Sequence, residues 1–171
     1  GTGGMAARLP GGTLRAALDY DPGALAFCRE RGVGPLLRGD ASALPFTEDS
    51  FDAALILDVL YHKNVADPAQ VLREARRVLV PGGWLVSRTP STDGRGAFQD
   101  PTHASFWNPN SFWYYTRREQ AQFVPGIRCR FQGTRIWQTF PTEWHQTHNI
   151  PYVYADLVAL KGQRQPGSCE I

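Results

Sequence analysis

The chain has 171 residues, of which 42% are hydrophobic and 20% charged, a composition that can bury the core of one domain and excludes an intrinsically disordered chain. The net charge of +2 gives no reason to expect nucleic acid or an anionic membrane as a partner, and no apolar run approaches the roughly 18 residues that a membrane-spanning helix needs. The three cysteines are far apart and form no C-x-x-C pair, so we expect neither a disulfide framework nor a zinc ribbon, and a cytoplasmic location.

The first part of the chain alternates between short apolar runs and helical patterns. Leu14–Leu18 predicts a buried strand. Asp21 followed by Pro22 predicts the start of a helix, because the aspartate can cap the first turn and proline lacks only an amide that would be unpaired there. We expect this helix to continue to about Arg31, and Pro35–Arg38 to form a short second strand.

Two more strands and a second helix follow in the same alternation. Ala53–Leu57 is apolar throughout, as expected for a strand covered by helices on both faces. Asp67-Pro68 repeats the helix start, and apolar residues at helical spacing continue to Leu79. A turn at Pro81-Gly82-Gly83 leads to a strand at Trp84–Arg88. This alternation predicts right-handed βαβ units in an α/β fold with a doubly wound, mostly parallel sheet.

The pattern changes at residue 89. Residues 89–111 predict a long loop, of the kind that is usually functional or mobile. Thr116 and Glu119 have the spacing of a capping box for a short helix. Arg130–Thr139 and Val153–Lys161 are strand-like with no helix expected between them, which predicts an antiparallel strand pair at the edge of the sheet.

Acidic residues follow the predicted strands at their carboxyl ends, where open α/β sheets bind ligands. A glycine-rich opening, Gly1-Thr2-Gly3-Gly4, precedes Asp19 by about 20 residues, the spacing at which a carboxylate can take both ribose hydroxyls. Asp40, one strand further, could accept a hydrogen bond from an adenine amino group. On these residues alone, adenosine binding competes with a plain tight turn and with helix caps.

Five sequence blocks in a fixed order make a more specific comparison. They read GTGG, LDYDP, GDASALPF, SFDAALILDVLYH and VLREARRVLVPGGWLV. In this order they resemble the class I S-adenosylmethionine-dependent methyltransferases, in particular the methyltransferase type 11-like group, over residues 1 to about 90. The expected antiparallel strand pair is similar to the sheet ending of that family. Dinucleotide dehydrogenases share the glycine turn and the acid, but not the LPF and PGG blocks.

The resemblance implies S-adenosylmethionine as the cofactor. Asp19 would bind the ribose hydroxyls, Asp40 would face the adenine amino group, and Asp58 would lie near the methionine end. The full set of implied cofactor residues is Gly1, Gly3, Asp19, Asp40, Ala41, Leu57 and Asp58. The expected organisation is one domain over residues 1–171, with a cofactor-binding half at 1–90 and an acceptor loop and strand pair at 91–171.

The beginning of the chain departs from the family pattern. In the family a buried central strand and an acidic residue precede the glycine turn, and none is present before Gly1. An exposed gap in the middle of a sheet would leave neighbouring strands with unpaired backbone groups. We therefore expect an N-terminally truncated form of a longer enzyme, without the first central strand.

The candidates for acid–base chemistry lie in the predicted loop. The stretch D-P-T-H at residues 100–103 resembles a loop of methyltransferases that act on sugars, glycans and small natural products. An oxygen or nitrogen acceptor has to lose a proton, for which histidine is suited. His103 is the preferred general base or acceptor-orienting residue, with Asp100 as its partner, and His62 is the second choice. The alternative is that His103 only caps the loop by hydrogen bonding.

An aromatic run provides candidates for acceptor binding. Trp107, Tyr114 and Tyr115 could wall a substrate pocket, because aromatic faces stack on sugar rings and planar acceptors. They could also simply anchor the loop to the core. Basic residues in the second half would suit an anionic acceptor, although a solvated face is the simpler interpretation. They are Arg117, Arg118, Arg128, Arg130 and Arg135.

The sequence thus predicts an enzyme that transfers the methyl group of S-adenosylmethionine to an oxygen, or with lower preference a nitrogen, of a small metabolite, sugar or glycan. Neither nucleic acid nor a membrane is an expected partner. His145 and His148 with Glu143 form no expected metal site, because prolines flank the segment and the spacing is lax. Two alternatives stay open: a non-catalytic adenosine-binding or interaction module with an incomplete methyltransferase fold, and an NAD-dependent dehydrogenase.

Overall fold

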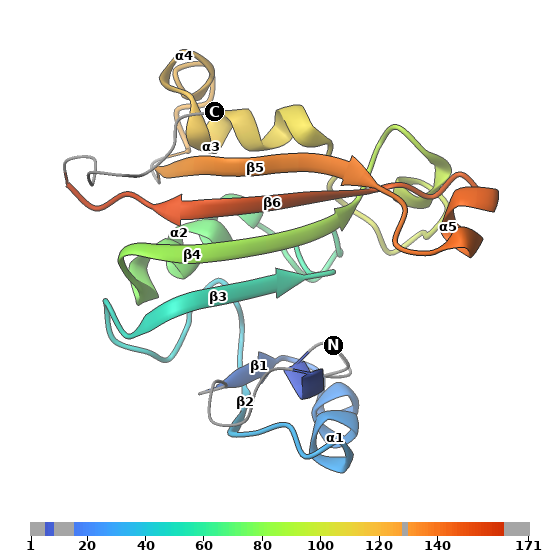
Figure 1. The fold of residues 1–171 in the computed structure, drawn as a ribbon. Coiled ribbons are helices and arrows are strands. Elements are labelled where there is room, and N and C mark those ends of the chain that lie inside the picture. The colour runs from blue at the N-terminus through green and yellow to red at the C-terminus, as the bar shows by residue number, and fades with distance from the viewer. Residues whose placement is uncertain (1–5, 9–15, 128–129, 163–171) are drawn as a thin grey trace. The chain divides into compact units, whose positions relative to one another are not determined.

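The structure is a computed structural model that describes residues 6–8, 16–127 and 130–162 (Figure 1). Contacts divide the chain into two compact units, Gly1–Pro45 and Phe46–Ile171, and each is described by itself. The single-domain organisation expected from the sequence stays a prediction.

The first unit is a small βαβ arrangement. Strands β1 (Ala17–Asp19) and β2 (Leu36–Arg38) pair in parallel, and helix α1 (Pro22–Glu30) connects them. Asp21 caps α1 as predicted, because its carboxylate accepts hydrogen bonds from the amides of residues 23 and 24 at 3.1 Å each. Gly32 ends the turn after α1 with φ +68°, a conformation that glycine adopts without strain. A short 3₁₀ helix, η1 (Ala6–Arg8), is also described.

The second unit contains a four-stranded mixed sheet in the order β3-β4-β6-β5 (Figure 1). β3 (Phe51–Leu57) and β4 (Leu79–Pro90) are parallel. β6 (Tyr152–Ala159) is antiparallel to β4 and β5 (Phe131–Thr139) is antiparallel to β6. The parallel strands and the predicted antiparallel pair are therefore confirmed.

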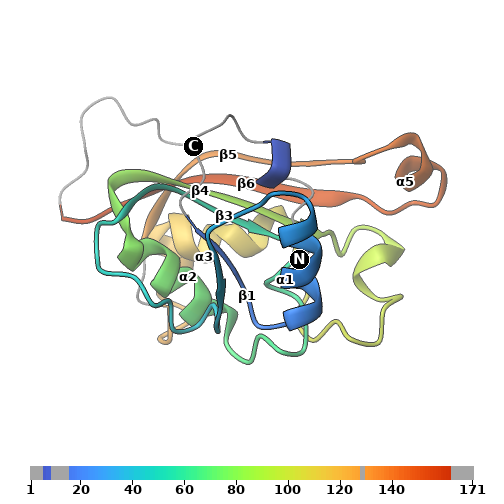
Figure 2. The same ribbon diagram turned by 90° about the horizontal axis from the view of Figure 1, so that it is seen from below.

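Helix α2 (Pro68–Val78) connects β3 to β4. Its predicted cap is confirmed, since Asp67 accepts hydrogen bonds from the amides of residues 69 and 70 at 2.9 and 3.1 Å. The apolar stripe expected from the sequence is buried, and consists of Val71, Leu72, Ala75 and Val78. Figure 2 shows α2 and α3 (Trp113–Thr116) on the same side of the four-stranded sheet.

Strand β4 is longer than the predicted Trp84–Arg88. The pairing with β3 jumps from Phe51↔Leu79 to Ala53↔Trp84, so the Pro81-Gly82-Gly83 segment bulges out within the strand. Gly82 has φ +81°, and a Cβ on residue 83 would lie 3.0 Å from the carbonyl oxygen of residue 80. The expected structural turn is present, but inside β4 rather than before it.

The segment after β4 contains short helices: two begin within the expected loop at residues 89–111, and the last confirms the short helix expected after residue 116. They are η2 (Arg95–Ala97), η3 (Pro109–Phe112), α3, and α4 (Arg118–Ala121). The predicted capping box at Thr116 and Glu119 is wrong. Thr116 is the last residue of α3, where its hydroxyl donates to the carbonyl of Phe112 at 3.0 Å, and Arg117 takes the N-cap position of α4 with no side-chain cap. The structure has a capping box at Asn108 and Ser111 instead.

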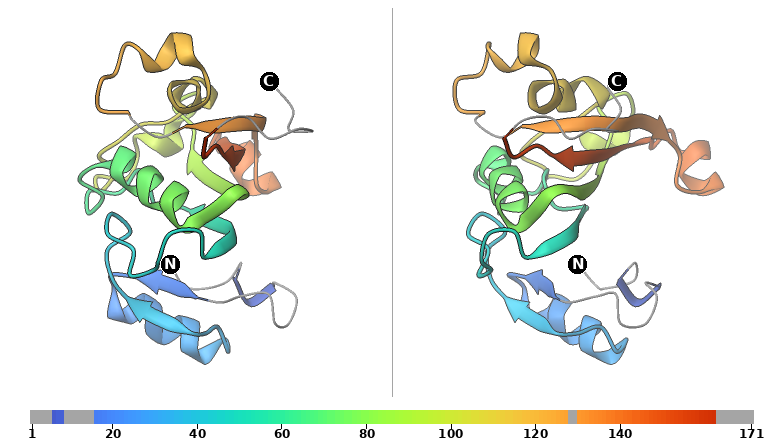
Figure 3. Two further views of the ribbon diagram at one scale, coloured as in Figure 1. Left: turned by 90° about the vertical axis from the view of Figure 1, so that its left-hand side faces the viewer. Right: turned by 60° about the vertical axis from the view of Figure 1, so that its left-hand side comes forward.

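A short helix also joins β5 and β6, where the sequence predicts none. This helix, α5 (Glu143–Thr147), lies beyond the end of the two strands in Figures 1 and 3. The hydroxyl of Thr142 caps it by accepting from the amide of His145. In the described ranges, no helix has both the length and the apolar character needed to cross a membrane.

Candidate functional site

In the first unit, two aspartates lie at the carboxyl ends of neighbouring strands. Asp19 is the last residue of β1, and Asp40 comes two residues after the end of β2. The strands are held together there, since the amide of Gly39 donates to the carbonyl of Asp19 at 3.1 Å. The carboxylate of Asp19 accepts from the amide of Asp21 at 3.0 Å, and that of Asp40 accepts from the amide of Ser42 at 2.8 Å. Local turns thus orient both carboxylates at one edge.

This pair fits the adenosine part of the expected cofactor. Ribose hydroxyls and an adenine amino group donate hydrogen bonds, and ionised carboxylates only accept them. Ala41, expected beside the adenine ring, follows Asp40 directly and is half-buried. Gly1 and Gly3 lie outside the described residues.

In the second unit, Asp58 follows Leu57 at the carboxyl end of β3. Its φ of +59° is unusual for a residue other than glycine, although aspartate tolerates this region better than most. The amide of Asp58 donates to the carbonyl of Arg88 at 3.0 Å, and the side chains of these two residues form an ion pair. The hydroxyl of Tyr61 donates to the Asp58 carboxylate at 3.4 Å, and the Arg88 guanidinium lies 5.5 Å from the centre of the Tyr152 ring.

Burial and the charge of Asp58 set the protonation of the neighbouring Tyr61, Tyr152 and Arg88 side chains. Burial, reinforced by the Asp58 carboxylate, raises the pKa of Tyr61 far above its ordinary value, so the phenol stays protonated and keeps donating. Burial and Asp58 also raise the pKa of Tyr152. Burial alone would lower the pKa of Arg88, but its hydrogen bond to Asp58 raises it, so Arg88 remains charged.

The two candidate histidines lie together although 40 residues of sequence separate them. His62 and His103 form an antiparallel β-bridge, and their ring centroids are 5.4 Å apart. The ring of Tyr61 lies 4.4 Å from each of the two imidazoles. Backbone bonds on both sides of the bridge hold it in place: Lys63 N to Thr102 O at 2.8 Å and Ala104 N to Tyr61 O at 2.7 Å.

His103 is buried and engaged. Its side chain is 7% exposed, and of its two ring nitrogens, Nδ1 and Nε2, Nδ1 donates to the carbonyl of Ala97 at 3.0 Å. That Nε2 lies 3.7 Å from the Asp100 carboxylate, beyond hydrogen-bond range. The loop-capping contact expected as the alternative role is therefore present, and Asp100 is close without bonding directly.

Asp100 is instead held by Thr102. The amide and the hydroxyl of Thr102 both donate to the same carboxylate oxygen at 2.8 Å, and these two bonds lower the pKa of Asp100. The Thr102 hydroxyl donates its hydrogen bond to Asp100, so its oxygen is left to accept from Nδ1 of His62, at a long 3.4 Å. Burial and the neighbouring His103 lower the pKa of His62, so its imidazole is neutral over a wider pH range than usual.

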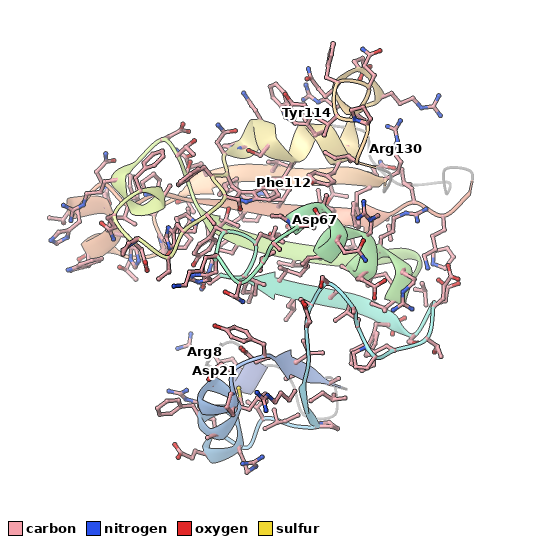
Figure 4. All side chains as sticks on the ribbon, turned by 180° about the vertical axis from the view of Figure 1, so that it is seen from behind. Arg8, Asp21, Asp67, Phe112, Tyr114 and Arg130 are labelled. Carbon is pink, nitrogen blue, oxygen red and sulfur yellow. The ribbon has the colours of Figure 1, made fainter. Side chains whose placement is uncertain are left out.

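The three aromatic residues expected at a substrate wall line one hollow of about 230 Å³. Trp107 and Tyr115 are each 5% exposed and stack on each other with centroids 6.2 Å apart, so they also anchor the segment to the core. Tyr114 is only half-buried. Figure 4, a view from the helix side, labels Tyr114 and the fully buried Phe112. The other side chains that line the hollow are Ser105, Phe106, Ser111, Val124 and Ile127.

Sequence reasoning missed Arg88, Thr102 and Tyr152. Arg88 carried a usable signal, because it is the one charged residue in the sequence of β4. Thr102 belongs to the D-P-T-H stretch but has no catalytic side-chain type of its own. Tyr152 has no local signal, since its contact with Arg88 arises from the pairing of β4 with β6.

Comparisons with known proteins agree with this architecture. A family described as "Methyltransferase domain" matches residues 1–87. A demethylmenaquinone methyltransferase of Mycobacterium sp. (strain KMS) is 42% identical over 87 residues, which cover 51% of this chain and 36% of the relative. A tRNA U34 carboxymethyltransferase of Campylobacter curvus is 30% identical over 119 residues, covering 64% of this chain and 36% of the relative. The matched parts thus span little more than a third of either relative.

Solved structures show the same fold. An S-adenosylmethionine-dependent methyltransferase from Thermotoga maritima, a possible histamine N-methyltransferase, superposes with a TM-score of 0.61 at 22% identity, covering 92% of this chain and 77% of that one. The matching family, the ordered sequence blocks and the mixed sheet agree with one another. The chain belongs to the methyltransferase-domain family of class I S-adenosylmethionine-dependent methyltransferases.

Proposed function

We propose that the protein transfers the methyl group of S-adenosylmethionine to an oxygen, or as the second choice a nitrogen, of a small-molecule acceptor. The observation that carries the proposal is the His62–His103 pair with Asp100 and Thr102, placed beside Asp58 in a chain of this family. It provides a positioned proton acceptor, which an oxygen or nitrogen acceptor needs.

Asp19 and Asp40 are proposed to hold the adenosine part of the cofactor. Their carboxylates are oriented by local turns at adjacent strand ends, so little entropy is lost when they bind. When bound, S-adenosylmethionine supplies an electrophilic methyl group. The roles implied for Gly1, Gly3, Ala41, Leu57 and Asp58 remain predictions.

The contacts favour His62 as the general base. Its Nδ1 faces the Thr102 hydroxyl, which leaves Nε2 to take the acceptor's proton, and its lowered pKa keeps that nitrogen free. Tyr61 is held protonated and cannot serve as the base. His103 is buried and bonded to Ala97, so we assign it the positioning of His62. This reverses the order in which the sequence ranks the two histidines.

The relatives support a small organic acceptor only in general terms. The acceptor named for the demethylmenaquinone methyltransferases does not transfer to this chain, because the match covers 87 residues and the family match ends at residue 87. The segment that carries His103 and the aromatic hollow begins after that point.

Calorimetry and a transfer assay test the proposal on the full chain. We expect S-adenosylhomocysteine to bind and NAD to show no binding. We also expect the protein to move labelled methyl groups from S-adenosylmethionine to at least one member of a panel of phenols, sugars and amines. Absence of S-adenosylhomocysteine binding would contradict the proposal. Binding without transfer to any acceptor would favour the non-catalytic module, and NAD binding would favour the dehydrogenase.

A further inference from the structure

The hollow lined by Trp107, Tyr114 and Tyr115 has a lining that can select among acceptors. Four of its eight lining side chains are aromatic, two are aliphatic and two are serines, and none of the eight is charged. Phe106 is 50% exposed and forms an accessible part of this wall, together with the half-buried Tyr114. An apolar hollow with few polar groups favours an apolar ligand with few polar substituents.

The two serine hydroxyls are already used within the protein. Ser105 donates to the carbonyl of Leu60 at 2.8 Å and accepts from the indole N–H of Trp107 at 2.9 Å. Ser111 accepts from the amide of Asn108 at 3.0 Å. Besides the phenol groups of Tyr114 and Tyr115, the lining offers a sugar ring few hydrogen-bond partners, which favours a flat ring with few polar substituents.

Arginines that the sequence suggested for an anionic acceptor are already in contact with tryptophan rings. The guanidinium of Arg117 lies 4.0 Å from the centre of the Trp113 ring, and that of Arg135 lies 4.1 Å from the centre of the Trp137 ring. Arg88 is paired with Asp58. Stacking on tryptophan thus engages two of the five arginines that the sequence suggested for an anionic acceptor.

The hollow is joined to the loop that carries His62. Ser105 lines the hollow, and its hydroxyl and amide bond to the carbonyls of Leu60 and Tyr61 at 2.8 and 3.3 Å. A hollow of about 230 Å³ is also of suitable size, since an apolar cavity of about 150 Å³ can hold a benzene ring.

We propose that this hollow binds an uncharged aromatic ring of the methyl acceptor, with Phe106 and Tyr114 as the residues that select it. This inference rests on the proposed function and narrows it to aromatic acceptors. Stacking on aromatic faces supplies the affinity, and the uncharged lining excludes phosphorylated sugars.

Saturation-transfer NMR, which measures the binding of 2-naphthol to the full chain without cofactor, tests the inference. Methyl glucoside and glucose 6-phosphate are the comparison probes. We expect 2-naphthol to bind and both sugars to show no binding. Phe106→Ala and Tyr114→Ala should each weaken 2-naphthol binding by about tenfold, the loss expected for one stacking partner. Phe123→Ala is the matched control, because Phe123 is 70% exposed and does not line the hollow.

The outcomes distinguish a failure of the aromatic-acceptor inference from a failure of the proposed methyltransferase function. No 2-naphthol binding, sugar binding of equal strength, or 2-naphthol binding that neither Phe106→Ala nor Tyr114→Ala changes would overturn the inference. Circular dichroism checks that the variants fold, and either of the two suffices for the test. S-adenosylhomocysteine binding is measured on the same samples. If it is absent, the proposed methyltransferase function fails, whereas the 2-naphthol result still decides the identity of the hollow.

Discussion

The part of the chain up to residue 87 and the part that follows it hold their functional side chains in different ways. In the first part, Asp19 and Asp40 each follow their own strand and bond to an amide two residues further on. In the second part, Asp100 is also held locally by Thr102, but the segment around it has distant partners: Ser91 donates to the side chain of Gln138, and the amide of Arg95 donates to the carbonyl of Asn149. Short motifs can therefore encode the proposed cofactor residues Asp19 and Asp40, whereas the segment after residue 87 also depends on long-range packing.

The histidine pair belongs to both parts. His62 lies in the part that matches the family, and His103 in the part that does not. Their bridge joins a segment inside the family match to a segment after it. The comparison therefore predicts that cofactor binding and acceptor chemistry can be disturbed separately.

The largest expected effect is on turnover. His62→Gln should lower kcat by about a thousandfold, because glutamine can hydrogen bond but cannot take the proton. The affinity for S-adenosylhomocysteine should stay within a factor of about three, as no cofactor contact is removed. His148→Gln is the control, since His148 is the C-cap of α5 and bonds to the carbonyl of Trp144. Equal turnover in the two variants would remove His62 from the mechanism.

The pH profile sharpens the same assignment. The pKa of His62 is lowered, so the acidic limb of kcat/KM should lie below the ordinary histidine pKa of about 6.5. The lowered pKa of His62 also makes the stability of the folded protein depend on pH. The unfolded chain binds the proton first, so the free energy of unfolding should fall as the pH drops from about 6.5 toward the folded pKa. Urea titrations at several pH values should show this loss in the wild type and less of it in His62→Gln.

The second largest effect concerns the cofactor. Asp19→Ala should weaken S-adenosylhomocysteine binding by about a hundredfold, because two hydrogen bonds to a charged acceptor are lost. Asp21→Ala is the matched control. It removes the cap of α1 and costs about 1 kcal/mol of stability, but leaves the Asp19 carboxylate in place. Calorimetry that finds equal losses for both variants would assign the effect to folding rather than to binding.

A smaller effect tests the packing of the second part. A Cβ added at residue 94 would lie 2.6 Å from the carbonyl oxygen of Asn149, and it would also clash with the ring of Pro151. Gly94→Ala should therefore lower the free energy of unfolding by about 2 kcal/mol. Gly126→Ala should change it by less than about 0.5 kcal/mol, since nothing lies within 4 Å of its added Cβ. Urea denaturation compares the two variants. Similar stabilities would show that the Asn149–Pro151 segment moves aside for the added methyl group at little cost.

The smallest effect returns to a local motif. Asp67→Ala should cost about 1 kcal/mol, because it removes the cap of α2. Its exposed ion pair with Arg73 adds little. Asp93→Ala, at an exposed loop position, should be nearly neutral in the same urea titration. A larger cost for Asp93 would contradict the assignment of local stability to the cap.

Particular elements show how far prediction from sequence reached. The two Asp-Pro helix starts, the strands after them and the antiparallel pair were predictable, because each depends on a cap or on a short apolar run. The capping box at Thr116 failed, since Thr116 belongs to α3 and Arg117 takes the N-cap position of α4. Helix α5 was missed because five residues carry no periodic signal.

The candidate site divides along the same line. The spacing indicated that Asp19 and Asp40 lie at strand ends, and the resemblance of the D-P-T-H stretch to a methyltransferase loop made Asp100 and His103, with His62 as second choice, candidates for proton transfer. Folding supplied the β-bridge between the histidines, the pairing of Arg88 with Asp58, and the hydroxyl of Thr102 between Asp100 and His62. Hydrogen bonds within a turn join residues that are already neighbours along the chain, whereas these contacts need loops closed between strands that no local pattern specifies.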